Sequence, residues 1–329
     1  MSDREIVQLA GIEVSRVTSS TPSCHSSSHK DVPVMSISKD GKVRFKNTER
    51  HPASNRCAGI AHFVQNIALK GVPSASLKRY EGDYYFEPHD AVQDSRDAMT
   101  LCFARNLQDP SRSRNSIVFP DFYQMFDYDG MLPKMRTDLI PWSAKLSKVL
   151  FAGTTTGSVD PSKNRRVQSC IWSLKNKDRF EFKLSSVCQM TSQELDLHCR
   201  EKGHDVRDIM GTFMSPAAHM KYKYIMNIEG NTCCWSRVPM IMSSNSLMMN
   251  LTHEEGNWFY PFLEDGVTHV DVLGIEKLEK IVDYYEERPL KCQEITAGAR
   301  AISERVCTQR AAALYSKAVL DAIADMRKK

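Results

Sequence analysis

The sequence lacks a long apolar run, a signal-peptide pattern and any CxxC pair of cysteines. No apolar run approaches the roughly 20 residues that a membrane span requires. The opening residues, Met1-Ser-Asp-Arg-Glu5, are not followed by the apolar stretch of a signal peptide. The ten cysteines include no CxxC pair, and so dilute a cysteine content in a long chain is typical of reduced thiols. These absences predict a cytoplasmic protein without a transmembrane segment.

A large charge of one sign is also missing. Lysine and arginine total 44 against 40 acidic residues, which gives a formal net charge of +4. We therefore do not expect nucleic acid as a partner, although a local basic cleft for phosphate stays open. Two common motifs are absent as well. The glycine-containing run at 153–157 is not followed by the Gly-Lys of a phosphate-binding P-loop, and Asn257 stands where a zinc HExxH motif starting at His253 needs its second histidine.

The length and the periodicity predict two α/β domains. A chain of 329 residues fits two domains of roughly 150 residues each. Apolar strands alternate with helical patterns in both halves, which is typical of mainly parallel sheets. We place the domains at 1–142 and 143–295, and expect a helical segment at 296–329 to pack across both. Strands are expected at 84–86, 116–119, 148–152, 179–184, 222–228, 246–249 and 269–272, helices at 55–70, 91–106, from 164 and at 278–285, and loops at 18–30 and 125–142.

Loops that follow strands are the candidate sites, because parallel sheets bind ligands beyond the carboxyl ends of their strands. The first is Gly153-Thr-Thr-Thr-Gly157. Glycine lets backbone N–H groups approach a phosphate, threonine adds hydroxyl donors, and a cation at Arg165 or Arg166 could neutralise a diphosphate. Taken alone, such a run is more often a plain turn.

A second glycine loop, Glu229-Gly230-Asn-Thr232, follows the strand expected at 222–228. A helix after such a loop offers free backbone donors at its N-terminus. Arg237 would lie in the first turns of that helix, and its fork of N–H donors suits a phosphate. A salt-bridged surface arginine fits the same pattern equally well.

Three acidic segments could take part in chemistry. Asp121 directly follows an expected strand in a partly apolar setting, which suits a general base, although an Asx turn is commoner for an isolated aspartate. The triplet Asp127-Tyr-Asp129 could hold Mn²⁺ or Mg²⁺, but it lies in a Pro/Gly-rich loop and such triplets arise often by chance. Glu255 lies close to the aromatic run 258–260. Rings and carboxylates together can hold a sugar, and the edge of an aromatic core is an equally good explanation.

The order of these segments resembles glycosyltransferase family 90, which includes protein O-glucosyltransferases, capsule xylosyltransferase-type proteins and lipopolysaccharide-core enzymes. The matching run comprises the strand Lys221-Tyr-Lys-Tyr224, the loop ending at Gly230, then Arg237, Ser246-Leu247, Glu255, 258–263 and 267–270. Upstream, Phe151-Ala-Gly-Thr154 with Arg165 looks like the family's Phe-Arg-Gly-Ser/Thr loop and its downstream arginine. The resemblance covers about residues 85–310. Ala152 departs from it by replacing an arginine, and one residue is inserted between Gly230 and Arg237.

The resemblance implies a GT-B fold, in which two Rossmann-like domains face each other across a cleft. It also implies an inverting transfer without a metal or other cofactor, from a UDP-sugar such as UDP-xylose or UDP-glucose to a hydroxyl of a glycan or glycolipid. Asp121 matches the catalytic base. The donor and its diphosphate are matched by Gly153, Thr154, Arg165, Gly230, Arg237 and Glu255.

Two other functions stay open at this point. One is a metal-dependent glycosyltransferase that uses Asp127 and Asp129, and the other is a non-catalytic protein that binds a glycan or a nucleotide. Asp90, Asp127 and Asp129 are the other candidates for the catalytic base.

Overall fold

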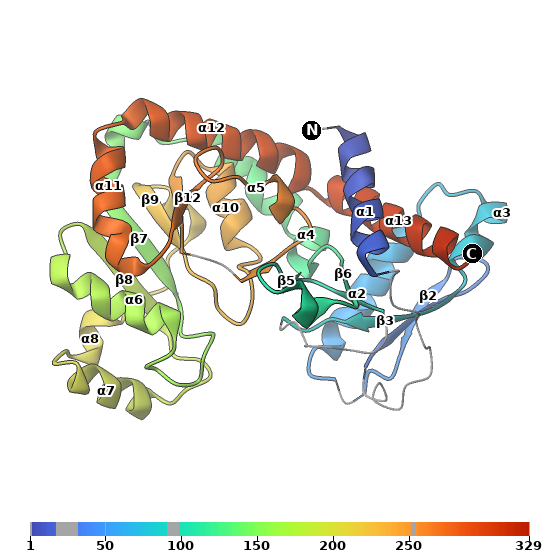
Figure 1. Ribbon diagram of the computed structural model, residues 1–329, viewed down its shortest axis with the longest axis horizontal. Helices are drawn as coiled ribbons and strands as arrows, with labels where there is room; N and C mark the ends of the chain where they lie inside the picture. The colour runs from blue at the N-terminus through green and yellow to red at the C-terminus, as the bar shows by residue number, and fades with distance from the viewer. Residues whose placement is uncertain (1, 18–31, 50, 91–98, 252–253, 329) are drawn as a thin grey trace. The chain divides into compact units, whose positions relative to one another are not determined.

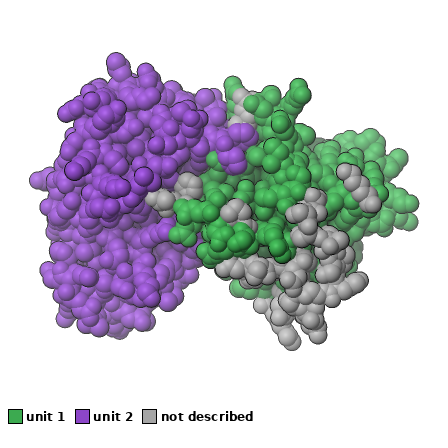
Figure 2. Space-filling view, viewed as in Figure 1, with its two compact units in different colours: residues 1–129, 254–260, 305–329 green, residues 130–253, 261–304 purple. Residues whose placement is uncertain are grey.

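The computed structural model describes residues 2–17, 32–49, 51–90, 99–251 and 254–328 (Figure 1). They form two compact units, coloured green and purple in Figure 2. Unit 1 comprises Met1–Asp129, Glu254–Tyr260 and Arg305–Lys329, and unit 2 comprises Gly130–His253 and Pro261–Glu304. The loop expected at 18–30, residues 91–98 of an expected helix and His253 lie outside the described residues. None of the helices within the described ranges combines the length and the apolar character needed to cross a membrane.

Unit 1 contains a mixed sheet in the order β2-β1-β3-β4-β6. Strand β1 runs antiparallel to β2 and β3, whereas β3, β4 and β6 are parallel. The strands are β1 (Val34–Ile37), β2 (Val43–Lys46), β3 (Gly82–Glu87), β4 (Thr100–Cys102) and β6 (Ser116–Val118), and a separate pair joins β5 (Arg105–Asn106) to β11 (Glu255–Gly256). The helices are α1 (Asp3–Val17), α2 (Ser54–Phe63), α3 (Ser74–Leu77), α4 (Phe122–Phe126) and α13 (Gln309–Met326).

Helices α1 and α13, from opposite ends of the chain, pack against each other in unit 1 (Figure 1). Each is amphipathic. Helix α1 buries Ile6, Ala10 and Val14, and α13 buries Tyr315, Val319 and Ile323, with four residues from each to the next. The pairing explains why the last helix belongs to unit 1.

Unit 2 is built on a wholly parallel sheet in the order β12-β10-β9-β7-β8. Its strands are β7 (Leu146–Thr154), β8 (Phe180–Ser186), β9 (Tyr222–Asn227), β10 (Leu247–Leu251) and β12 (Val270–Val272). The helices are α6 (Arg165–Ser173), α7 (Ser192–Glu201), α8 (Val206–Ile209), α9 (Pro216–His219), α10 (Arg237–Ser243) and α11 (Leu278–Glu286), with α5 (Tyr128–Thr137) and α12 (Pro289–Val306) at the junctions of the chain with unit 1. Buried strand residues such as Phe151, Phe182 and Tyr224 form the core with the helices that cover the sheet.

The predicted α/β class with parallel strands is confirmed, and all seven expected strands are present. Two local predictions were wrong. Residues 99–106 form β4 and β5 instead of a helix, because the continuous apolar run 101–104 is buried, as in an interior parallel strand. The loop expected at 125–142 is largely α4 and α5. Burial of Tyr128, Leu132 and Met135 on one face outweighs the helix-breaking tendency of Gly130 and Pro133.

The division into units also differs from the predicted domains. The first boundary lies between Asp129 and Gly130 and not near residue 143. Residues 254–260 return to unit 1, and the expected helical segment at 296–329 is divided between the two units at residue 305. Whether a late segment of the chain joins the first unit depends on contacts between distant residues, which local periodicity does not reveal.

The strand order of unit 2 reverses between β7 and β9. From β7 the chain passes to β8 on one side and then crosses to β9 on the other, which is the flavodoxin-like order. Strands β7 and β9 pair from Leu146 to Leu150, although β7 continues to Thr154. Open α/β sheets bind ligands at such a reversal, beyond the carboxyl ends of the strands.

Candidate functional site

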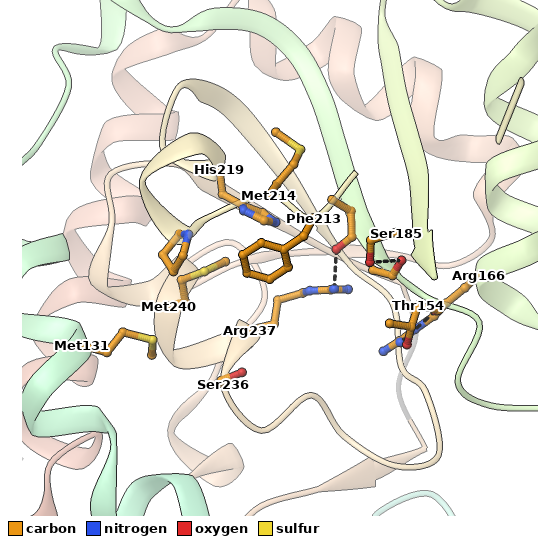
Figure 3. A pocket seen from close by; sticks show the side chains of 13 residues that line it. Met131, Thr154, Arg166, Ser185, Phe213, Met214, His219, Ser236, Arg237 and Met240 are labelled. Atoms are coloured by element: carbon orange, nitrogen blue, oxygen red, sulfur yellow. Dashed lines mark hydrogen bonds between the residues drawn. The ribbon is translucent and has the colours of Figure 1, made fainter. Parts of the chain in front are cut away.

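A cavity of about 330 Å³ lies in unit 2 beside the end of β7 and the start of α10 (Figure 3). It has two chemically different sides. The polar side consists of Thr154, Arg166, Ser185, Ser236 and Arg237. The apolar side consists of Met131, Phe213, Met214, Pro216 and Met240. The cavity therefore occupies the position that the strand order predicts for a ligand.

Arg237, the first residue of α10, brings an unpaired cationic group to this cavity. Its Nη2 donates to the carbonyl of Ala152 at 2.6 Å, and its guanidinium lies 4.7 Å from the centre of the Phe151 ring. Its Nη1 is buried and has no hydrogen-bond partner among the described residues. Burial, reinforced by the charge of Arg166, lowers the pKa of Arg237 to about 10, so it stays protonated at neutral pH.

Arg166 supplies a second positive charge and holds the loops in place. Its guanidinium donates to the carbonyls of Thr154, Ile228 and Glu229 at 3.1–3.2 Å and to the hydroxyl of Thr156. It thereby ties the loop after β7 to the loop after β9. Neither Arg166 nor Arg237 pairs with a carboxylate in the described ranges. Two adjacent, largely buried cations without a counter-ion favour the binding of an anion.

Two glycines make room for these guanidinium groups. A Cβ atom at Gly153 would lie 2.8 Å from Nη2 of Arg237, and one at Gly230 would lie 2.9 Å from Nη2 of Arg166. The amide of Gly157, by contrast, donates to side-chain oxygens of Gln189 and Asn231 at 2.8 and 3.1 Å. Close approach of arginine thus explains Gly153 and Gly230 better than a cradle of free amides does.

Substitution Gly153→Ala should weaken anion binding while the protein stays folded. The added methyl group would be too close to both Nη2 of Arg237 and Cζ of Phe151, at 2.8 and 3.0 Å, so the guanidinium must move. We expect a loss of about tenfold in affinity for pyrophosphate, measured by calorimetry, since a charge-assisted hydrogen bond contributes about 1.5–3 kcal/mol. Gly130→Ala, where the added methyl group meets open space outside the cavity lining, is the control for alanine at a glycine position of unit 2. Unchanged pyrophosphate affinity in Gly153→Ala would contradict this role.

The structure brings some of the predicted donor-binding residues together and leaves others apart. Gly153, Thr154 and Arg237 line the cavity, and Gly230 packs behind it against Arg166. The side chain of Arg165 is 42% exposed, does not line the cavity and lies 3.5 Å from the carboxylate of Glu229.

Glu255 and Arg166 also differ from what the sequence predicted. Glu255 belongs to unit 1 and is not part of the cavity lining. Arg166 was considered with Arg165 as a possible cation, but the resemblance assigned the diphosphate contact to Arg165. The spacing of Arg166 from Cys170 and Ser173 on the buried face of α6 is a signal that could have identified it.

Asp121 has a structural role within unit 1. It caps the N-terminus of α4, where its Oδ1 accepts from the backbone of Gln124 at 3.1 Å. Its Oδ2 accepts from Nδ2 of Asn257 at 2.7 Å and from the hydroxyl of Tyr128 at 3.3 Å. The residue is 1% exposed, and burial raises its pKa to about 6. The capping role expected as the alternative is present, and the role of catalytic base stays a prediction.

Two of the other acidic candidates also have partners. Asp90 lies 2.6 Å from Arg56, and Asp129 accepts from the backbone of Gln309 at 3.0 Å. Asp127 ends α4. Across the described residues, no three histidine, cysteine or acidic side chains gather as a metal site would require.

No family model and no curated protein matches this chain. Among solved structures it is similar to the crystal structure of TarM, with a TM-score of 0.41 and 11% identity over 65% of this chain and 39% of TarM. It is also similar to Anabaena HepE in complex with UDP and glucose and with UDP alone. The TM-scores are 0.39 and 0.41, and both have 12% identity over 69% of this chain and 64% of HepE. The chain thus spans less than two thirds of either protein. Because these TM-scores are low, we infer function from the cavity.

Proposed function

We propose that the cavity of unit 2 binds the diphosphate of a nucleotide-sugar, and that the protein is a glycosyltransferase. The supporting observation is the pair of largely buried arginines, Arg166 and Arg237, at the reversal of strand order. Nη1 of Arg237 is buried and has no partner within the described ranges, so we infer that the guanidinium turns to bring this donor to a phosphate oxygen. Arg166 uses its donors on the loops and contributes its charge.

The proposed reaction is a single displacement with inversion. The acceptor hydroxyl oxygen forms a bond to the anomeric carbon as the bond from that carbon to the diphosphate oxygen breaks. Negative charge grows on the leaving diphosphate, where the two guanidinium groups stabilise it. The hydroxyl proton passes to a carboxylate, for which Asp121 is the candidate from the sequence.

The identities of donor and acceptor rest on the sequence resemblance. It favours a UDP-sugar, with xylose or a hexose such as glucose, and a glycan or glycolipid acceptor. A non-catalytic nucleotide-binding protein would have the same cationic cavity and would bind UDP without turning over any UDP-sugar. A metal-dependent enzyme would need Asp127 and Asp129 near the donor.

Turnover of the donor should be indifferent to EDTA. The two guanidinium groups supply the positive charge that a metal ion otherwise brings to a leaving diphosphate. The test measures UDP release from UDP-xylose, UDP-glucose and other UDP-sugars, with and without EDTA. Activity that disappears with EDTA and returns with Mn²⁺ would support the metal-dependent alternative. UDP binding without turnover of any donor or acceptor combination would support the non-catalytic one.

A further inference from the structure

Phe213 stands out among the residues of the cavity because it is 80% exposed. Phe151 and Phe182, in the same unit, are 0% and 1% exposed. A single exposed aromatic ring on a protein surface needs no explanation. An exposed aromatic residue on the wall of a cavity that also holds two cations without a carboxylate partner is a stronger sign of ligand binding.

The segment that carries Phe213 is anchored on both sides. The backbone of Gly211 donates to the carbonyl of Leu184 in β8 at 2.9 Å. Two residues after Phe213, Ser215 caps α9 and its carbonyl lies 2.9 Å from Nδ1 of His219. The ring is therefore presented by a short segment with fixed ends, which reduces the entropy lost when a ligand binds.

The side chains around Phe213 form an apolar surface next to the cationic one. In Figure 3, Phe213, Met240 and Arg237 lie around the same space, with Met214 and His219 beyond the ring. Methionine side chains adapt to flat rings and make favourable sulfur–aromatic contacts. Burial lowers the pKa of His219, so this histidine is neutral at physiological pH and leaves the positive charge of the cavity to the arginines.

These two surfaces match the two ends of a nucleoside diphosphate. Its phosphates need cations, and its base offers a flat aromatic face that stacks on another ring. We propose that Phe213 is the residue on which the base of the donor nucleotide stacks, a step that rests on the proposed function. The stacked base fixes one end of the donor while Arg237 holds the diphosphate.

Stacking predicts that Phe213 matters for nucleotide and not for bare diphosphate. Binding of UDP and of inorganic pyrophosphate is measured by calorimetry for the wild type, Phe213→Ala, Phe213→Leu and Phe213→Trp. We expect about tenfold weaker UDP binding in Phe213→Ala and unchanged pyrophosphate binding. Leucine, which keeps apolar area without a ring, should bind UDP more weakly than tryptophan does. Leu290→Ala, at a 75% exposed position of α12, is the control for loss of an exposed apolar side chain.

The outcomes separate this proposal from the one on which it rests. A wild-type protein that binds neither UDP nor pyrophosphate overturns the diphosphate site and the stacking role together. Normal UDP binding by Phe213→Ala, with intact pyrophosphate binding, overturns the stacking role alone. An equal loss of affinity for UDP and for pyrophosphate in Phe213→Ala also overturns the stacking role. The ring would then act by positioning the arginines and not by contacting the base. Unchanged UDP binding with a raised KM for the acceptor would instead assign the ring to an acceptor sugar.

Discussion

Arg237→Ala should weaken UDP binding about ten- to hundredfold. The guanidinium has one donor on the carbonyl of Ala152 and another, Nη1, without a partner in the described part of the chain. A charge-assisted hydrogen bond to phosphate contributes about 1.5–3 kcal/mol, which corresponds to this range. Pyrophosphate binding should fall by a similar factor, because the contact is to the diphosphate and not to the base. Calorimetry with both ligands measures the effect.

The melting temperature gives an independent test of whether Arg237 binds a ligand. An unpaired, largely buried charge costs free energy, and the protein retains such a group where a ligand neutralises it. Arg237→Met keeps most of the apolar stem and removes the charge. We therefore expect its melting temperature without ligand to equal or exceed that of the wild type, while UDP no longer raises it to the same extent. A structural arginine would give the opposite result, a lower melting temperature and normal affinity.

Two further variants test whether the loss of any positive charge in unit 2 would weaken UDP binding. Arg207→Met removes the guanidinium of a side chain that is 87% exposed and paired with Asp205, so its effect on UDP affinity should be small. Arg165→Met tests the residue that the sequence favoured, and its pairing with Glu229 outside the cavity lining predicts a minor effect. Normal UDP affinity in folded Arg237→Ala, or a larger loss in Arg165→Met, would contradict the assignment of Arg237.

Unit 2 was easier to predict from the sequence than unit 1. Strands β7 and β9 contain apolar runs and lead into glycine-containing loops, so these strands and the loops that carry Gly153 and Gly230 could be recognised. Their order in the sheet could not, because strand pairing depends on distant contacts. Arg237 was identified because it follows such a loop. Phe213 was not, since the segment before α9 has no periodic pattern and the exposure of the ring is a property of the folded chain.

The surroundings of Asp121 in unit 1 could not be predicted from the sequence, and the contacts of Gln124 show why. Its Oε1 accepts from Nε1 of Trp258 at 2.7 Å, and its Nε2 donates to the carbonyls of Val306 and Thr308. With the bond from Asn257 to Asp121, this buried network joins segments that lie far apart in the sequence. A local pattern identifies Asp121 as an aspartate after a strand, but it cannot show that partners from a distant segment enclose the carboxylate.

Asp121→Asn should therefore destabilise unit 1, by about 1–3 kcal/mol of unfolding free energy at neutral pH, because a buried donor left without an acceptor costs this amount. The oxygen of the new asparagine side chain can still accept from the backbone of Gln124. Its NH₂ group would then face Nδ2 of Asn257, which is also a donor. Asn257 cannot rotate its amide without giving up the bond that its Oδ1 accepts from the backbone of Trp258. Denaturant unfolding followed by tryptophan fluorescence measures the loss.

The difference in unfolding free energy between the wild type and Asp121→Asn should also depend on pH, which gives a sharper test. Burial raises the pKa of Asp121 from 3.8 to about 6, so the folded state holds the proton more tightly than the unfolded state. Its contribution to stability is therefore fully present below about pH 4 and is lost as the pH rises to about 6. About two pKa units correspond to roughly 3 kcal/mol. Because the asparagine side chain of the variant does not titrate, the stability of the wild type relative to Asp121→Asn should fall across this window.

Asn257→Ala distinguishes this structural role from catalysis, because it disrupts the same network and leaves the carboxylate in place. If Asp121 is the base, Asp121→Asn should lower kcat about 10²- to 10⁴-fold in the folded fraction, while Asn257→Ala loses far less and both bind UDP normally. If Asp121 only supports the fold, both variants should lose stability and keep near-normal kcat once corrected for the folded fraction. In that case Asp90, Asp127 and Asp129 become the candidates for the base, and the same substitution at each would identify it.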